Sequence, residues 1–163
     1  MRVVSNTSPL SSLARIGRLN LLCKQCSQLL VPEAVVKELR DPASPPALKT
    51  VDQALQEGWI IPAQVRDRRL VRLLTSELDL GEAEAIALAM ETSAGLILID
   101  ELEGRRTARR LGLRVTGVLG VLLRAKKAGQ IRSLRREVEA LRKQAHFFIS
   151  PRVEGDVLRA AGE

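Results

Sequence analysis

The chain has 163 residues, 45% of them apolar and only 2% aromatic, and its formal net charge is +7. This length and composition predict one compact domain with an aliphatic core, which suits parallel strands covered by helices. Two cysteines and one histidine exclude a four-ligand zinc site without carboxylates. Because no apolar run is long enough to span a membrane and the first residues lack the pattern of a secretion signal, we expect a cytoplasmic protein.

The first third of the chain predicts short strands that alternate with helices. Residues 1–5 have the β-branched pattern of a strand, and residues 9–22 repeat apolar side chains at helical spacing. A second apolar run at 28–31 precedes a predicted helix at 32–40, in which a proline occupies the favoured first turn. Three prolines within residues 41–49 exclude regular structure, so we predict a loop there.

The middle of the chain continues this alternation. Residues 58–62 predict a short edge strand that ends at a proline, and residues 67–78 predict a helix. Residues 78–117 then predict helix, strand, helix and strand in order, with the strands at 95–99 and 113–117. The first of these two strands is so uniformly apolar that we expect it to be covered on both faces.

Two more helices are predicted after the last strand. Residues 118–129 end at a glycine, and residues 133–145 place their apolar side chains on one face. Repeated alternation of strands and helices favours a doubly wound α/β fold, with a parallel sheet and right-handed crossovers. In sheets of this kind, ligands bind outside the carboxyl ends of the strands.

Polar side chains follow two of the predicted strands at those carboxyl ends. Asn6 follows the first strand, and Asp100 follows the strand at 95–99. Each has a purely structural alternative, because Asn6 can cap the helix that begins near Pro9 and Asp100 can cap the helix after it. The residues themselves leave both interpretations open.

Glu38 is a third candidate for the same site. It lies near the C-terminal end of its predicted helix, where a negative charge opposes the helix dipole. Because it follows Val35 by three residues, it projects close to the apolar face of that helix. A partly exposed glutamate paired with an arginine or a lysine is the alternative.

Glu82 and Glu84 cannot both serve one site from one helix. Residues two apart point about 200° apart around the helix axis. Glu82 lies one turn before Ile86 on the apolar stripe, so we assign Glu82 to the site and give Glu84 a surface or interface role. Stabilisation of the helix N-terminus by both charges is the structural alternative.

Glu38, Glu82 and Asp100 can converge near Asn6 if these elements assemble as a parallel sheet. Carboxylates that lie close together repel one another and recruit divalent cations. Oxygen ligands without histidine or cysteine favour Mg²⁺ or Mn²⁺. Such ions catalyse the cleavage of phosphodiester bonds.

Basic residues are concentrated late in the chain. Thirteen Lys and Arg lie between Arg105 and Lys143, against two glutamates. Such a face suits a polyanion, but the charge alone favours solvated helix surfaces, because charge runs are common on exposed helices. Arg105 and Arg106 are the candidates for phosphate contact because they follow the proposed acidic pocket, and ion pairs with Glu101 and Glu103 are their structural alternative.

Five stretches resemble PIN-domain proteins in order and spacing. They are "VVSNTSPLSSLARIG", "VPEAVVKEL", "LDLGEAEAIALA", "LILIDELEGRRTARRLGL" and "VTGVLGVLLRAKKAG". The group they resemble is the prokaryotic branch described as predicted nucleic-acid-binding PIN proteins. The resemblance covers residues 1–130, which would form a PIN-like domain, and residues 131–163 would form a helical extension packed on it. It implies a three-layer α/β/α sandwich with a mainly parallel sheet.

The resemblance also implies a function. PIN proteins include Mg²⁺- or Mn²⁺-dependent ribonucleases, and many are toxins of toxin–antitoxin pairs, often homodimers held inactive by a small antitoxin protein. Carried over by position, the family's acidic quartet falls on Asn6, Glu38, Glu82 and Asp100. Thr7 and Ser8 match the small hydroxyl residues that follow the first acid, and Glu103 is a further supporting acid.

Asn6 departs from the family pattern, which has aspartate at this position. Asparagine still offers a carbonyl oxygen, but it brings one negative charge fewer and cannot act as a carboxylate base. Glu101 or Glu103 can compensate for that charge. The leading hypothesis is therefore a metal-dependent endoribonuclease of the toxin type, and the alternative is a weakened PIN module that binds RNA or a partner protein without cutting. A nucleotide-binding protein is disfavoured, because no glycine-rich phosphate loop follows the first strand.

Overall fold

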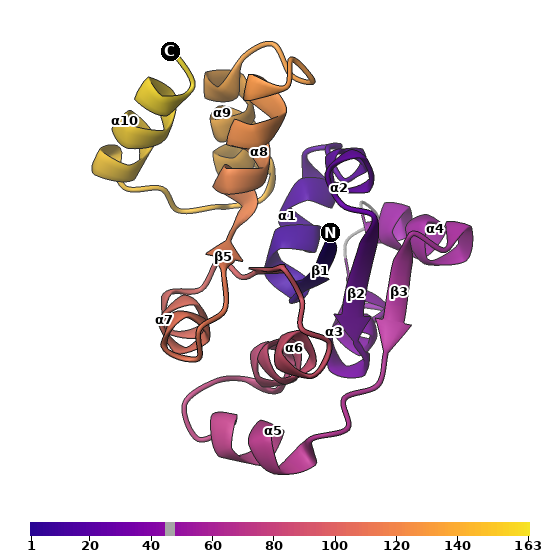
Figure 1. The fold of residues 1–163 in the computed structure, drawn as a ribbon. Coiled ribbons are helices and arrows are strands. Elements are labelled where there is room, and N and C mark those ends of the chain that lie inside the picture. Colours follow the sequence, from indigo (N-terminus) through magenta and orange to yellow (C-terminus); the bar gives the residue numbers. More distant parts are fainter. Residues whose placement is uncertain (45–47) are drawn as a thin grey trace.

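The structure, a computed structural model, describes residues 1–44 and 48–163 and contains one parallel five-stranded sheet (Figure 1). The middle of the loop predicted at 41–49 lies outside the described residues. The strands are β1 (Arg2–Ser5), β2 (Gln28–Pro32), β3 (Ile60–Ala63), β4 (Leu96–Leu98) and β5 (Val115–Thr116), and their order in the sheet is β3-β2-β1-β4-β5.

Helices connect and follow these strands. Within the described residues they are α1 (Thr7–Arg15), α2 (Asn20–Gln25), α3 (Glu33–Leu39), α4 (Lys49–Glu57), α5 (Arg68–Leu74), α6 (Leu80–Glu91), α7 (Leu102–Arg110), α8 (Val118–Lys127), α9 (Leu134–Gln144) and α10 (Pro151–Ala160). The doubly wound parallel α/β fold predicted from the alternation is confirmed.

The single helix predicted at 9–22 is wrong, because the structure has two helices there. Gly17 adopts a left-handed φ of 68° after α1, and the Arg18 amide donates to the Leu13 carbonyl, which ends that helix. Residues 50–57, for which no element was predicted, lie in α4.

Alternate residues of the central strands face opposite layers of helices. Val3 and Leu29 belong to the apolar core beneath α1, α2 and α8, whereas Val4 and Leu30 belong to the core beneath α5 and α6. This period of two is the geometry of an extended strand. The sheet is therefore covered on both faces, as the uniformly apolar strands predicted.

The helices after residue 130 share the first of these two cores. Apolar residues of α9 and α10 lie in the same cluster as those of α1 and α8, and the three C-terminal helices lie together in Figure 1. The Glu163 carboxylate accepts hydrogen bonds from the backbone amides of Leu134 and Arg135 at the start of α9, and it pairs with Lys126 of α8. These bonds join the end of the chain to both helices.

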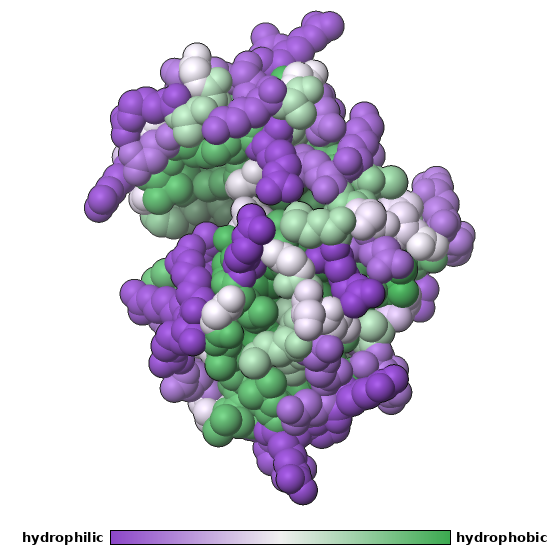
Figure 2. Space-filling model, viewed as in Figure 1, coloured by the Kyte–Doolittle hydropathy of each residue, from purple (hydrophilic) through white to green (hydrophobic). Residues whose placement is uncertain are grey.

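Polar and hydrophobic side chains gather in different parts of the face shown in Figure 2. Figure 2 shows polar side chains around the outline of one face and a band of hydrophobic ones along its middle. Within residues 1–44 and 48–163, no helix is both long enough and apolar enough to cross a membrane.

The order of the strands creates one special position at the carboxyl edge of the sheet. From β1 the chain adds β2 and β3 on one side, and β4 and β5 lie on the other side. The ends of β1 and β4 are paired, with Ser5 opposite Leu98 and the Asn6 amide donating to the Leu98 carbonyl at 3.2 Å. This reversal of strand order is where doubly wound sheets bind ligands.

Candidate functional site

A polar pocket of about 240 Å³ lies at the carboxyl end of β1. Residues from the starts of α1, α6 and α7 and from the end of α3 enclose it. They are Asn6, Thr7, Ser8, Ser11, Glu38, Asp79, Gly81, Glu82 and Glu101. The pocket therefore gathers side chains from four separate segments of the chain at the reversal of strand order.

Asn6 is only 3% exposed, and the nitrogen and the oxygen of its side-chain amide have different surroundings. Its Nδ2 donates to Glu101 Oε2 at 3.0 Å, while its Oδ1 is buried with no hydrogen-bond partner among the described residues. Asn6 occupies the N-cap position of α1, but its side chain makes no capping hydrogen bond there. The capping interpretation of Asn6 is therefore wrong.

Asp100 follows β4 and is fixed through one oxygen. Its Oδ1 accepts the Val118 amide at 2.9 Å, so it caps α8 rather than the helix that follows it directly. Its Oδ2 is buried without a partner in the described part of the chain. Burial raises the pKa of Asp100 to about 6, and the bond from Val118 opposes this rise. A Cβ on Gly117 would lie 2.3 Å from Oδ1, so only glycine leaves room for this carboxylate.

Arg105 and Arg106, the two candidates for phosphate contact, are both engaged within the protein. The Arg105 guanidinium is partly buried and donates to the Ile99 carbonyl at 2.9 Å. Burial lowers the pKa of Arg105, while the nearby Asp100 opposes this change. Arg106 is exposed and pairs with Glu103.

Glu82 begins α6 as part of a reciprocal cap. Asp79 Oδ1 accepts the Glu82 amide at 2.8 Å, and Glu82 Oε2 accepts the Asp79 amide at 3.3 Å. Glu82 Oε1 is buried and unpaired within the described residues. Burial, reinforced by the charge of Asp79 and more weakly by Glu101 and Glu38, raises the pKa of Glu82 to about 7.

The surface or interface role predicted for Glu84 is wrong, because Glu84 is only 6% exposed. One of its oxygens accepts the Ala34 amide at the start of α3, and the other pairs with Arg68 of α5 at 2.8 Å. The prediction assumed one exposed face on α6, but the helix is buried from Gly81 through Ala89. Glu84 thus ties α6 to the helix that carries Glu38.

Glu38 is exposed and reaches the pocket from α3. Its Oε2 accepts a hydrogen bond from the Thr7 hydroxyl, which lies just beyond β1. Its Oε1 would lie 2.9 Å from a Cβ on Gly81, so the carboxylate extends over the first turn of α6. Thr7 and Glu38 thereby connect the start of α1 with the end of α3 across the pocket.

The two remaining acids are separated by the structure. Glu101 lines the pocket, whereas Glu103 lies in a different hollow with Arg106, Arg109 and Arg110. Asp79 also lines the pocket, and the sequence analysis missed it. The position of Asp79 could have been predicted from the sequence, because an aspartate three residues before a glutamate at the start of an apolar helix is typical of a capping box.

The donor atoms of this pocket have the chemistry that a hard divalent cation requires. Three buried oxygens have no partner within residues 1–44 and 48–163. Those of Asn6 and Glu82 belong to residues that line the pocket, whereas Asp100 does not line it and precedes the pocket residue Glu101 in the chain. In the same residues, no three His, Cys, Asp or Glu side chains are grouped closely enough to hold a metal ion. The donor types, carboxylate and amide oxygens without nitrogen or sulfur, fit Mg²⁺ or Mn²⁺, but three of these carboxylates would have to come closer together to hold one ion.

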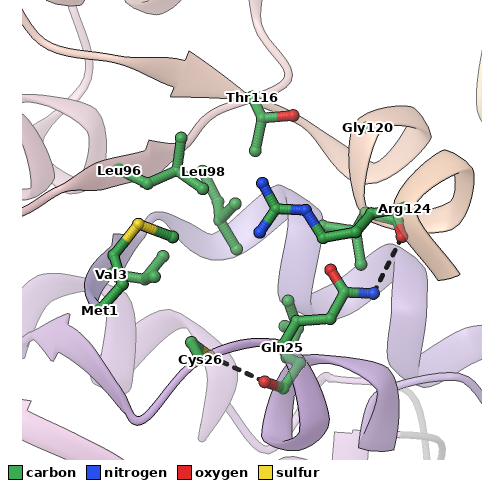
Figure 3. Close-up of a pocket in the computed structure, with 11 residues that line it drawn as sticks. Met1, Val3, Gln25, Cys26, Leu96, Leu98, Thr116, Gly120 and Arg124 are labelled. Atoms are coloured by element: carbon green, nitrogen blue, oxygen red, sulfur yellow. Dashed lines mark hydrogen bonds between the residues drawn. The ribbon is translucent and has the colours of Figure 1, made fainter. Parts of the chain in front are cut away.

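A second pocket has none of this chemistry (Figure 3). It lies beside the starts of β1 and β4, is lined mainly by apolar residues, and receives Arg124 from α8. Its one thiol, on Cys26, donates to the Leu22 carbonyl, and burial raises the pKa of Cys26 to about 11. A protonated thiol is a poor nucleophile, so the polar pocket is the candidate site.

Comparisons with known proteins give one family and one similar fold. A family model described as a PIN domain matches residues 2–163. A PilT N-terminus domain protein from the hyperthermophilic archaeon Sulfolobus solfataricus P2 is similar in structure, with 18% identity and a TM-score of 0.51 over 74% of this chain and 90% of that chain. At this identity the likeness shows the fold alone. No curated protein matches the chain.

Gly104→Ala is expected to destabilise the protein although alanine favours helices. A Cβ at this position in α7 would lie 2.8 Å from Glu82 Oε1 and 2.9 Å from the buried Ile99. Such overpacking costs about 1–3 kcal/mol of unfolding free energy, measurable by urea denaturation. The control is Gly155→Ala in α10, where only the end of Arg159 lies within reach, and it should stabilise by about 0.5–1 kcal/mol. Equal effects of the two substitutions on the unfolding free energy would show that a side chain at position 104 does not collide with Glu82 and Ile99.

Glu82→Gln is expected to raise the melting temperature at pH 8 and to change it little at pH 4. The folded-state pKa of Glu82 lies near 7, above its ordinary value of 4.5. The folded protein therefore holds this proton more tightly, and the wild type loses stability as the pH rises from about 4.5 to 7. Glutamine does not ionise, so thermal melts of both proteins should diverge over that range. Parallel melting curves at every pH would show that Glu82 is not desolvated in solution.

Proposed function

Since the chain belongs to the PIN-domain family, we propose that it is a metal-dependent endoribonuclease of the toxin type. Its fold is of the nuclease type, PIN domains commonly bind nucleic acid, and they generally use divalent metals. The observation that carries the proposal concerns three buried oxygens, on Asn6, Glu82 and Asp100, near the position where this sheet reverses its strand order. They have no hydrogen-bond partner within the described part of the chain. Unpaired buried oxygens are costly for folding, which favours a functional role.

In this proposal Glu38, Glu82 and Asp100 hold Mg²⁺ or Mn²⁺, with Asn6 contributing its carbonyl oxygen. When bound, the ion acidifies water and stabilises negative charge on the phosphate. Glu82 Oε1, which is buried and has no partner in the described residues, is the proposed acceptor for the proton of the attacking water. The water oxygen then bonds to phosphorus as the bond to the leaving ribose oxygen breaks, and that oxygen takes a proton from solvent.

Three contacts orient these groups before any substrate arrives. Val118 fixes one oxygen of Asp100, Asp79 fixes one oxygen of Glu82, and Thr7 fixes one oxygen of Glu38. Each carboxylate therefore has a second oxygen that this contact leaves available. Restricting the side chains in this way reduces the conformational entropy lost when they come together around an ion.

RNA is the proposed substrate because α7 begins at the pocket and carries arginines along its length. Arg106 and Arg110 are exposed and form ion pairs with Glu103 and Glu77, and Arg109 is exposed next to them. Exposed ion pairs are weak and exchange readily for phosphate. Arg105 is the less accessible of the two original candidates, since one of its nitrogens is bonded to the Ile99 carbonyl.

The alternative function is a PIN module that binds RNA or a partner protein without cutting it. The presence of Asn6, which lacks a carboxylate, favours this candidate, as does the separation of the carboxylates in the described residues. The endoribonuclease proposal also includes action in the cytoplasm, as the sequence led us to expect. It further includes a homodimer and control by a small antitoxin protein, which the family resemblance supports.

Wild-type protein freed of any antitoxin is expected to cleave mixed RNA with Mn²⁺ and to stop when a chelator is added. Asp100→Asn should reduce the rate by at least about a hundredfold, because it removes a charged ligand yet keeps an oxygen for the Val118 amide. Asp156→Asn, an exposed acid of α10, is the matched control and should cleave at the wild-type rate. Gel assays of labelled RNA measure all three rates.

The same assay separates the two candidate functions. Cleavage by Asn6→Asp but not by the wild type would favour the binding module, as would salt-sensitive RNA binding that persists without metal. No cleavage by either protein with Mn²⁺ would contradict the endoribonuclease proposal.

A further inference from the structure

Glu101 makes a contact with Asn6 that none of the other acids makes. Its Oε2 accepts the Asn6 Nδ2 at 3.0 Å, and both side chains line the polar pocket. Glu101 stands at the N-cap position of α7, yet its side chain caps no amide of that helix. The carboxylate is therefore directed at the pocket rather than used to begin α7.

The direction of this hydrogen bond determines how Asn6 presents itself. A carboxylate accepts only from the amide nitrogen, so Glu101 holds the Asn6 side chain with Nδ2 toward it and Oδ1 away from it. That Oδ1 is the buried oxygen with no partner in the described residues, on a side chain that is 3% exposed. An aspartate at position 6 would instead place two carboxylates 3.0 Å apart, where they repel.

We propose that Glu101 is a ligand of the divalent cation at this pocket and supplies the negative charge that Asn6 lacks. In this arrangement Asn6 positions Glu101 through Nδ2 and keeps Oδ1 for the cation. The inference rests on the proposed metal-dependent function and adds a residue and a charge to its site. Asparagine at position 6 is then matched to the glutamate at 101, and the pair carries one negative charge in total.

Glu103 provides a natural comparison within the same turn. It carries the same charge two residues later, but it pairs with Arg106 and lines the separate hollow of α7. If only the overall negative charge of this region attracted the cation, the two glutamates would contribute alike, since both are exposed. If Glu101 is a ligand, only its removal matters.

The test is the binding of Mn²⁺ alone, measured by isothermal titration calorimetry without RNA. Glu101→Gln should weaken the affinity by at least about tenfold, whereas Glu103→Gln should change it by less than about twofold. The double variant Asn6→Asp/Glu101→Gln exchanges donor and acceptor across the same hydrogen bond and keeps the total charge. Its affinity should return to within about threefold of the wild type.

Each other outcome has a distinct meaning. Unchanged affinity in Glu101→Gln, an equal loss in Glu103→Gln, or no recovery in the double variant would overturn the proposed role of Glu101. No Mn²⁺ binding by the wild type would overturn that role and the metal dependence of the proposed function together. Mn²⁺ binding that depends on Glu101 in a protein that cuts no RNA would support the site and contradict only the endoribonuclease.

Discussion

The parallel pairing of β1 with β4 is the constraint on which the rest of the structure depends. It sets Ser5 opposite Leu98 and extends one hydrogen bond further, from the Asn6 amide to the Leu98 carbonyl. Asn6 and Asp100, 94 positions apart in the sequence, therefore leave the sheet at neighbouring points. Because strand order reverses between these two strands, the helices that follow them diverge and leave a pocket at the edge.

Burying the carboxylates of Glu82 and Asp100 costs free energy of folding, and nearby glycines leave room for them. Buried carboxylates disfavour their charged form, and the pKa values of Glu82 and Asp100 are raised to about 7 and about 6. Two glycines, Gly104 and Gly117, give these carboxylates room where any side chain would collide with them. Local arrangements that weaken the folded state without strengthening a core are typical of functional sites.

Much of the fold could be predicted because its signals are local. Alternating apolar runs and helical spacing indicated the parallel α/β class, and helix geometry separated Glu82 from Glu84. The burial of Glu84 could not be predicted, since it depends on α3 and α5 packing on the remaining sides of α6. The choice between Glu101 and Glu103 also needed the structure, because it depends on how the turn after β4 directs each side chain.

The most direct test of the central claim is an anomalous diffraction map from crystals grown with Mn²⁺. One well-occupied peak is expected beside the pocket, in contact with Asn6 Oδ1 and with carboxylate oxygens of Glu38, Glu82, Asp100 and Glu101. Density for Mn²⁺ only elsewhere, for example beside exposed acids such as Asp156, would show that the buried oxygens of this pocket do not form a cation site.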